Sequence, residues 1–128
     1  MIYITSTLKS DWNVAFNQKL CDYLESHGCS VHLPQRDTNQ AGSAMDKYEQ
    51  NMSAMQKADI ILCVAQNESI NWGVEVGYVY GIQKNVIALA QTDHDLPVMS
   101  LGMFSAVVRG DDLDDIDSYG ETLLSLVR

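Results

Sequence analysis

Basic residues are scarce in this sequence. Its 8 lysines and arginines stand against 17 aspartates and glutamates, which gives a formal net charge of −9. A surface of this sign repels the phosphate backbone of a nucleic acid, so we expect no polymeric nucleic-acid partner. A small phosphorylated ligand stays open, because a pocket needs only one or two local cations and some oriented backbone N–H groups.

Long apolar runs and cysteine pairs are also missing. No run of about 18 apolar residues could span a bilayer, and no charged-then-apolar leader opens the chain, so we expect no membrane association and a cytoplasmic protein. Cys21, Cys29 and Cys63 form no CxxC pair and have no histidines at metal-ligand spacing. We therefore predict no disulfide framework, no metal site and no cofactor. The length predicts one domain, 1–128.

The sequence does contain a regular alternation of strand-length apolar runs and helical patterns. A central run, apolar on both faces, is typical of an inner parallel strand. We predict an α/β fold with three layers and a five-stranded, mostly parallel sheet of flavodoxin-like or Rossmann-like order. Ligands bind such sheets at the carboxyl ends of the strands. The runs are 2–5, 31–33, 60–64, 86–89 and 106–108, and the helical patterns lie at about 12–27, 44–57, 70–83 and 118–127.

The helical pattern after the central run has an unusual composition. Ser69 is a good N-cap, and Gly73, Gly77 and Gly81 follow on one helical face. Each glycine costs about 1 kcal/mol relative to alanine inside a helix, so we expect this face to approach backbone or substrate closely. Glu75 lies in the first turn or so, where the helix macrodipole favours the ionised form that a nucleophile requires. From spacing alone, such a residue can also simply complement the dipole.

A longer motif surrounds Glu75. Residues 58–87 read Ala-Asp, an apolar strand, a polar turn, Gly-Val-Glu-Val-Gly-Tyr at 73–78 and Lys-Asn-Val-Ile at 84–87. This order and spacing resemble the signature block of the nucleoside 2-deoxyribosyltransferases and their hydrolase relatives. The resemblance implies that Glu75 is the catalytic nucleophile and that Tyr3, in the first strand, is the active-site tyrosine that orients it.

Further positions fit this resemblance. Gln35 falls where the transferases place a base-contacting glutamine, and Met99 matches a methionine that borders the family's pocket. Ser69 stands where the transferases carry an aspartate for the sugar hydroxyl and the 2'-deoxynucleoside 5'-monophosphate N-glycosidases carry a phosphate-binding serine. A hydroxyl can donate to a phosphate oxygen, whereas a carboxylate would repel it. Ser69 therefore favours the hydrolase branch.

The loop 6–10, Ser-Thr-Leu-Lys-Ser, resembles the hydroxyl-rich basic phosphate loop of the same hydrolases. The resemblance implies that Thr7 and Lys9 bind phosphate. Ser105 matches a serine that, in the hydrolases, reaches the phosphate from a neighbouring subunit. A homodimer with shared active sites is the expected assembly. A methionine-rich stripe on the helix 44–57 suits either the core or a subunit contact.

Two positions depart from the family pattern. Asn51 stands where the family has an aspartate that helps to protonate the leaving base, and general acid help is worth about 10²–10⁴ in rate. Asp46 and Glu49 lie on other faces of that helix, so they could replace it only after rearrangement. Asn71 stands where the hydrolases have glycine, at the sugar or phosphate edge. Beside it, Trp72 either closes over the ligand or packs in the core.

The sequence therefore predicts an N-glycosidase that hydrolyses the base–sugar bond of a (deoxy)nucleoside 5'-monophosphate through a glycosyl-enzyme ester. A deoxyribosyltransferase would use the same nucleophile. A catalytically weak nucleotide-binding or sensing module is the alternative that Asn51 motivates. An NAD-consuming glycosidase is a further one, because Ser69, Trp72 and Glu75 also resemble the catalytic block of Toll/interleukin-receptor-like domains.

Overall fold

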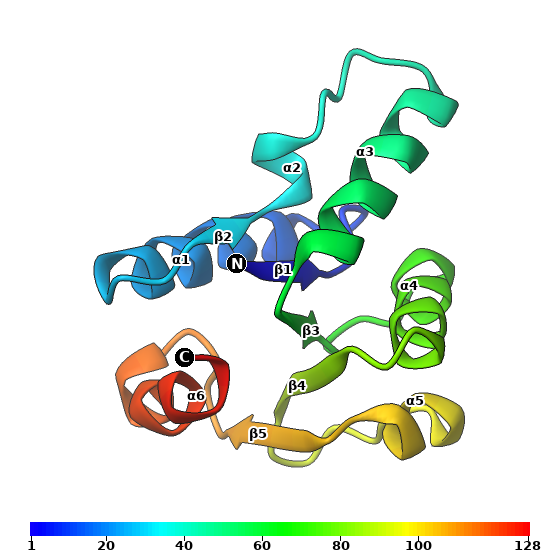
Figure 1. The fold of residues 1–128 in the computed structure, drawn as a ribbon. Coiled ribbons are helices and arrows are strands. Elements are labelled where there is room, and N and C mark those ends of the chain that lie inside the picture. Colours follow the sequence, from blue (N-terminus) through cyan, green and yellow to red (C-terminus); the bar gives the residue numbers. More distant parts are fainter.

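A five-stranded parallel sheet forms the centre of the molecule (Figure 1). The structure, a computed structural model, describes residues 1–128. The strand order β2-β1-β3-β4-β5 is the flavodoxin-like order, and every neighbouring pair is parallel, so the predicted fold class is confirmed. The strands are β1 (Ile2–Thr5), β2 (Val31–His32), β3 (Ile60–Val64), β4 (Asn85–Gln91) and β5 (Ala106–Gly110).

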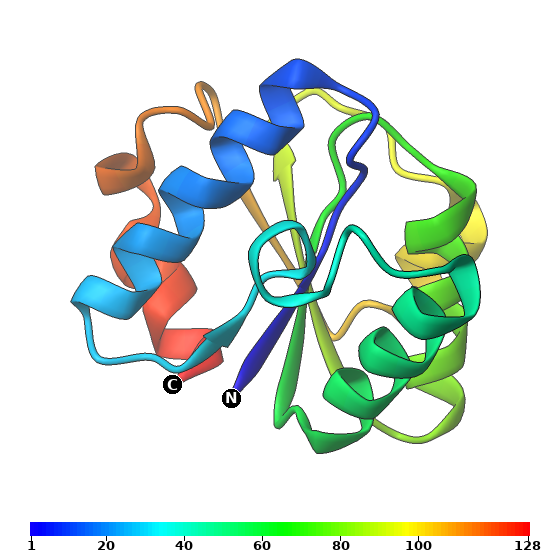
Figure 2. The same cartoon turned by 90° about the horizontal axis from the view of Figure 1, so that it is seen from above.

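Helices cover both faces of the sheet (Figure 2). On one face lie α1 (Asp11–Ser26) and α6 (Gly120–Val127), and on the other lie α3 (Ala44–Lys57), α4 (Ile70–Gly81) and α5 (Val98–Met103). A short helix, α2 (Pro34–Asp37), follows β2, and a 3₁₀ turn, η1 (Ile116–Ser118), precedes α6. None of the helices has the length and apolar character needed to cross a bilayer.

The helix boundaries follow from local capping. The Ser10 hydroxyl accepts from the Asn13 N–H at the start of α1, and Gly28, with a φ of +85°, takes the left-handed conformation just after its end. At the start of α3, Ser43 and Asp46 form a reciprocal capping box. Asp46 therefore already has a structural role, which makes it a poor substitute for an active-site acid.

Two short helices, α2 and α5, lie outside the helical patterns that the sequence predicted. α2 has four residues and α5 has six, so neither is long enough to display a 3.6-residue periodicity. Pro34 opens α2, where its fixed φ suits the first helical position. This turn of helix brings the Gln35 side chain to α1, where it donates to the Val14 carbonyl.

The sheet divides the core into two clusters, because alternate residues of each strand point to opposite faces. In β1, Ile2 and Ile4 pack towards α1 and α6, whereas Tyr3 packs towards α3 and α4. The α1/α6 side holds mostly large aliphatic side chains. The α3/α4 side has small residues in the strands or just after them, Cys63, Ala65, Ala88 and Ala90, in the cluster that contains Trp72. Tyr3 thereby reaches the layer that carries Glu75.

Candidate active site

Glu75 lies in α4, beside the carboxyl end of β1. The Tyr3 hydroxyl donates to its carboxylate, with distances of 2.9 Å to Oε1 and 3.2 Å to Oε2. The Thr5 hydroxyl donates to Oε2 at 3.4 Å. Because residues 3 and 5 of a strand point to the same face, β1 presents both hydroxyls to one carboxylate. The predicted pair of Glu75 and Tyr3 is therefore in direct contact, and Thr5 is a partner that the sequence alone did not single out.

Tyr3 is held rigidly. Its side chain is fully buried, and its ring stacks on His32 with centroids 5.4 Å apart and an interplanar angle of 11°. Burial and the neighbouring Glu75 carboxylate raise the pKa of Tyr3, so the phenol keeps its proton. Tyr3 is therefore a permanent donor to Glu75.

The environment of Glu75 balances two opposing effects. Burial raises its pKa, while the hydrogen bonds from Tyr3 and Thr5 lower it, and the net shift is upward. The expectation that the helix macrodipole keeps it ionised is wrong, because α4 begins at Ile70 and Glu75 lies beyond its first turn. The two hydroxyls of β1 stabilise the carboxylate instead.

A cavity of about 120 Å³ lies in front of Glu75. Glu75 is its only charged wall residue, and hydroxyls and amides supply the other polar groups. A second cavity, of about 440 Å³, adjoins it between α3 and α4 and has an apolar wall with one cation, Lys47. Together they fall in the size range of small-molecule sites, roughly 300–1,000 Å³. The walls have five residues in common: Leu8, Pro34, Asn51, Asn71 and Glu75.

Hydroxyl groups line one part of the smaller cavity. Ser69 caps α4 as predicted, with its Oγ accepting from the Trp72 N–H at 3.2 Å. A hydroxyl that accepts one bond still has its own proton to donate, so Ser69 remains available to a ligand. Thr7 is buried in the wall, where its Oγ1 accepts from the Lys9 N–H at 3.2 Å. The Lys9 side chain itself is exposed and lies outside the wall.

Asn13 fixes the two loops that meet at this cavity. Its Nδ2 lies 3.1 Å from both the Ser6 Oγ and the Gln66 carbonyl oxygen, and its Oδ1 accepts from Asn67 at 2.8 Å. One fully buried amide thus joins the loop after β1 to the loop after β3. The sequence held a signal for it: Asn13 and Asn17 fall at i and i+4 on the face of α1 that otherwise buries Phe16.

Asn51 lies in the wall of both cavities, as a residue at the family's acid position should. Its Oδ1 accepts from the Thr38 hydroxyl at 2.6 Å, and the oxygen of that hydroxyl lies 3.3 Å from the His32 Nε2. The geometry is therefore that of an ordered site residue, while an amide supplies no proton to a leaving group.

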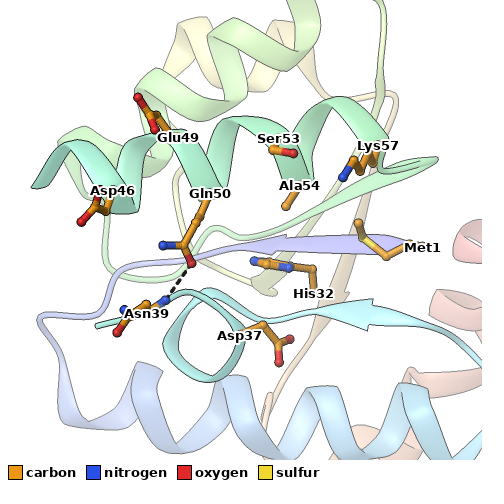
Figure 3. A pocket seen from close by; sticks show the side chains of 10 residues that line it. All are labelled: Met1, His32, Asp37, Asn39, Asp46, Glu49, Gln50, Ser53, Ala54 and Lys57. Carbon is orange, nitrogen blue, oxygen red and sulfur yellow. Dashed lines mark hydrogen bonds between the residues drawn. The ribbon is translucent and has the colours of Figure 1, made fainter. Parts of the chain in front are cut away.

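The carboxylates next along α3 serve a different cavity. Asp46 and Glu49 line a space of about 560 Å³ between α3 and the segment around β2 and α2, where the Asn39 N–H donates to the Gln50 side chain at 2.9 Å (Figure 3). Glu75 does not border it. Neither carboxylate therefore borders the cavity that Asn51 and Glu75 share.

Besides Lys9 and the buried Tyr3, four predicted residues lie outside the wall of the smaller cavity. Gln35 is bonded through both ends of its amide to α1: its Nε2 donates to the Val14 carbonyl at 2.9 Å, and its Oε1 accepts from Asn17 at 3.1 Å. Gly73 is close to Glu75 in sequence but does not line the cavity, and the position that a Cβ would take there has no neighbouring atom within 4 Å. Met99, on α5, is exposed. Ser105 is also exposed and donates to the Val86 carbonyl, at the amino end of β4.

Two expectations about α4 are thereby resolved. At Gly73, Gly77 and Gly81 no neighbouring atom lies within 4 Å of the position that a Cβ would take, so the expected close approach to backbone is wrong within one chain. Trp72 is only 1% exposed and belongs to the core cluster, so it packs inside and does not close over a ligand. The glycine face and the exposed Met99 and Ser105 are left to solvent or to another molecule.

The fold is shared with solved structures of low sequence identity. A 2-deoxyribosyltransferase from Bacillus psychrosaccharolyticus has a TM-score of 0.75 at 18% identity, covering 96% of this chain and 94% of that one. A conserved protein from Enterococcus faecalis V583 has a TM-score of 0.73 at 16% identity, with 91% and 96% covered. The CMP N-glycosidase BcmB from Clostridium botulinum has a TM-score of 0.69 at 14% identity, with 98% of both chains covered.

A match to a family model shows the family of the chain, which structures of such low sequence identity do not. No curated protein matches the sequence. The family model of the nucleoside 2-deoxyribosyltransferases, however, matches residues 2–116, a range that contains the signature block and every predicted site residue. The resemblance inferred from the motifs is thereby confirmed, and the chain belongs to the nucleoside 2-deoxyribosyltransferase family.

Proposed function

We propose that this protein is an N-glycosidase that hydrolyses the base–sugar bond of a nucleoside 5'-monophosphate, with Glu75 as its nucleophile. The observation that carries the proposal is a half-buried carboxylate, held by hydroxyls of Tyr3 and Thr5, at the wall of a cavity that has no other charged group. A carboxylate fixed in this way is suited to attack a sugar carbon from one side.

The first chemical step forms a glycosyl-enzyme ester. A Glu75 oxygen bonds to C1' while the bond from C1' to the base nitrogen breaks and its electron pair leaves with the base. Tyr3 and Thr5 hold the carboxylate in a fixed orientation, so little reorganisation precedes the attack. Water then attacks C1', loses a proton to solvent and releases the sugar phosphate and the free carboxylate. Two displacements at one carbon retain its configuration.

A phosphate suits the hydroxyl-lined part of the cavity. Ser6, Thr7 and Ser69 supply hydroxyls there, and Glu75 is the one group that would repel an anion. Lys9, two residues beyond Thr7, is free to swing over the entrance because it is exposed and makes no ion pair. The CMP N-glycosidase with the same fold supports a monophosphate as the substrate class.

A second copy of the chain would complete the site. Ser105 and Met99, which the family resemblance assigns to the pocket, are exposed and do not border the cavity of their own chain. Large apolar side chains are exposed on the same layer, and Val74 among them borders the adjoining cavity. Apolar patches of this kind mark interfaces. We propose a homodimer in which this layer is buried and each partner contributes to the other's pocket.

Asn51 favours one alternative, a nucleotide-binding or sensing module. An amide cannot donate the proton that the departing base needs, and its carbonyl is already bonded to Thr38. Such a module would bind nucleotides through the same cavity and release no base.

One experiment separates these functions. The purified protein is incubated with ribo- and deoxynucleoside monophosphates, nucleosides and NAD, and released base is measured by chromatography with and without a second free base. We expect base release from monophosphates, faster than from the matching nucleosides. A new nucleoside in the presence of the second base would identify a transferase, and release from NAD alone an NAD glycosidase. Nucleotide binding without any release would establish the sensing module and overturn the hydrolase.

A further inference from the structure

Asn17 is a buried amide in the wall of the Glu75 cavity. It lies on α1, one helical turn after Asn13, and is fully buried. Asn13 ties the hydroxyl-bearing loops together, whereas Asn17 is bonded to Gln35 of α2. One turn of helix separates the two amides by about 6 Å along the axis. Asn17 therefore faces the part of the cavity that Leu33 and Pro34 enclose, away from the proposed phosphate loop.

The orientation of the Asn17 amide follows from its neighbours. The Val14 carbonyl can only accept, so Gln35 must turn its NH₂ group towards it, which leaves the Gln35 oxygen towards Asn17. That oxygen can only accept as well, so Asn17 must present its NH₂ group to Gln35. The chain of donors and acceptors thus leaves the Asn17 Oδ1 as the free end.

That oxygen has no partner. The Asn17 Oδ1 is one of two buried side-chain polar atoms in the protein that make no hydrogen bond. Buried polar groups nearly always have a partner, and a lone one points to a missing donor. Because Asn17 borders the cavity, a bound molecule can bring that donor.

We infer that the Asn17 Oδ1 reads the leaving base by accepting a hydrogen bond from an exocyclic amino group. The inference rests on the proposed function, since it assigns the base to this part of the cavity. Bases with an amino group, of the cytosine or adenine type, supply the missing donor. Their oxo counterparts would place a carbonyl oxygen against a carbonyl oxygen, with no proton between them. Asn17 is thus a specificity-determining residue, and Gln35 is a positioning residue that acts through it.

The test is the ratio of kcat/KM for paired substrates, CMP against UMP and AMP against IMP, with the deoxy forms alongside. An unpaired buried acceptor costs enough that we expect roughly a tenfold or greater preference for the amino partner. Asn17→Leu should bring the ratio close to one. Gln35→Leu frees the Asn17 amide to turn its NH₂ group into the cavity, so the ratio should fall or reverse while base release continues.

A matched control lies next in the chain. Gln18 donates to Asp22 on the surface of α1, so Gln18→Leu should keep the wild-type ratio. Should Asn17→Leu fail to fold, the wild-type ratio and Gln35→Leu still decide the matter. Equal kcat/KM values for amino and oxo partners would overturn the role of Asn17 and leave the hydrolase standing.

Binding separates a failure of the inference from a failure of the proposed function. If no substrate releases base, calorimetry of CMP and UMP on the wild-type protein replaces the kinetic ratio. Tighter binding of CMP by the same factor, lost in Gln35→Leu, would support Asn17 as the reader of the base without hydrolysis. Equal affinities, or no binding of either nucleotide, would overturn it.

Discussion

The two helical layers of this protein differ in how they meet solvent. The α1/α6 layer closes over a continuous aliphatic core, and α6 exposes no large apolar side chain. The opposite layer buries a smaller cluster and leaves much of its outer surface apolar. Its exposed side chains include Met45 and Tyr48 on α3, Ile70, Val74 and Tyr80 on α4, and Val98, Met99 and Leu101 on α5.

The two layers therefore differ in role: the α1/α6 layer mainly stabilises the fold, and the opposite layer carries most of the proposed site. The closed layer fixes the sheet through well-packed residues such as Leu20 and Leu123, both fully buried. The open layer carries Glu75, the proposed nucleophile, together with Asn51 and Asn71, which border the same cavity. The exception is the first half of α1, where the buried Asn17 borders the cavity and the buried Asn13 joins the two loops beside it. A change in the closed layer should therefore act on folding, and a change in the open layer on catalysis or assembly.

The largest effect is expected at Glu75. Glu75→Gln keeps the shape and can still accept from Tyr3, but an amide is not a nucleophile, so base release should fall by about 10³-fold or more. Initial rates measured by chromatography check this. Glu68→Gln is the matched control, because Glu68 is exposed and is bonded only to His94, and it should retain the wild-type rate. Base release that survives Glu75→Gln would contradict the assignment of the nucleophile.

The closed layer should respond in stability alone. Leu123→Ala opens a cavity in a fully buried part of α6 and should lower the free energy of unfolding by roughly 2–5 kcal/mol. Urea denaturation measures the change, and the activity per folded molecule should be that of the wild type. Val74→Ala, at a side chain that is 64% exposed, should change the unfolding free energy of the dissociated chain by no more than about 0.5 kcal/mol. Similar decreases in the free energy of unfolding for Leu123→Ala and Val74→Ala would contradict the distinction between the layers.

Asn51→Asp should raise activity. The new carboxyl would stand in the wall of the cavity, keep the bond from Thr38 and supply the missing proton, so we expect about a tenfold increase in kcat or more. Gln50→Glu is the control, because Gln50 lines the other cavity and its oxygen already accepts from Asn39. An unchanged kcat in Asn51→Asp would show that protonation of the base does not limit the reaction.

The smallest effect is a pH-dependent stability difference at Glu75. Burial raises the pKa of Glu75 above its unfolded value, so the folded protein favours the protonated form. Its contribution to stability is present below the unfolded pKa and is lost as the pH rises through the folded pKa. Glu75→Gln should therefore be more stable than the wild type at pH 7, by a margin that shrinks on acidification. Base release by the wild type should fall over the same acidic range. Denaturation and rate profiles against pH measure both.

Much of the fold was predictable from the sequence, because strand-length apolar runs mark the strands and the periodic spacing of apolar residues marks the longer helices. The doubly apolar run at 60–64 is the central strand, and Ser69 caps α4. The short α2 was not predictable, since four residues carry no period. The sequence therefore could not predict that Gln35 is bonded to α1 and does not line the cavity.

The sequence predicted the site residues that belong to a family motif. It did not predict the residues that join the site only through tertiary packing. The resemblance linked Tyr3 to Glu75 across the sequence, and the two are in contact. Thr5 shares that contact only because alternate strand residues point to the same face. Asn13 and Asn17 interrupt an apolar stripe, which indicates buried polar groups. Their partners, however, lie in the loop after β3 and in α2, and no local sequence pattern relates these segments to α1.

The central claim is that Glu75 becomes covalently attached to the sugar. Mass spectrometry of the wild-type protein, acid-quenched during turnover of a nucleoside monophosphate and digested, tests it most directly. We expect a sugar phosphate ester on the peptide that contains Glu75, and none when the reaction is quenched before substrate is added. An ester on a different carboxylate, with Glu75 unmodified, would contradict the account.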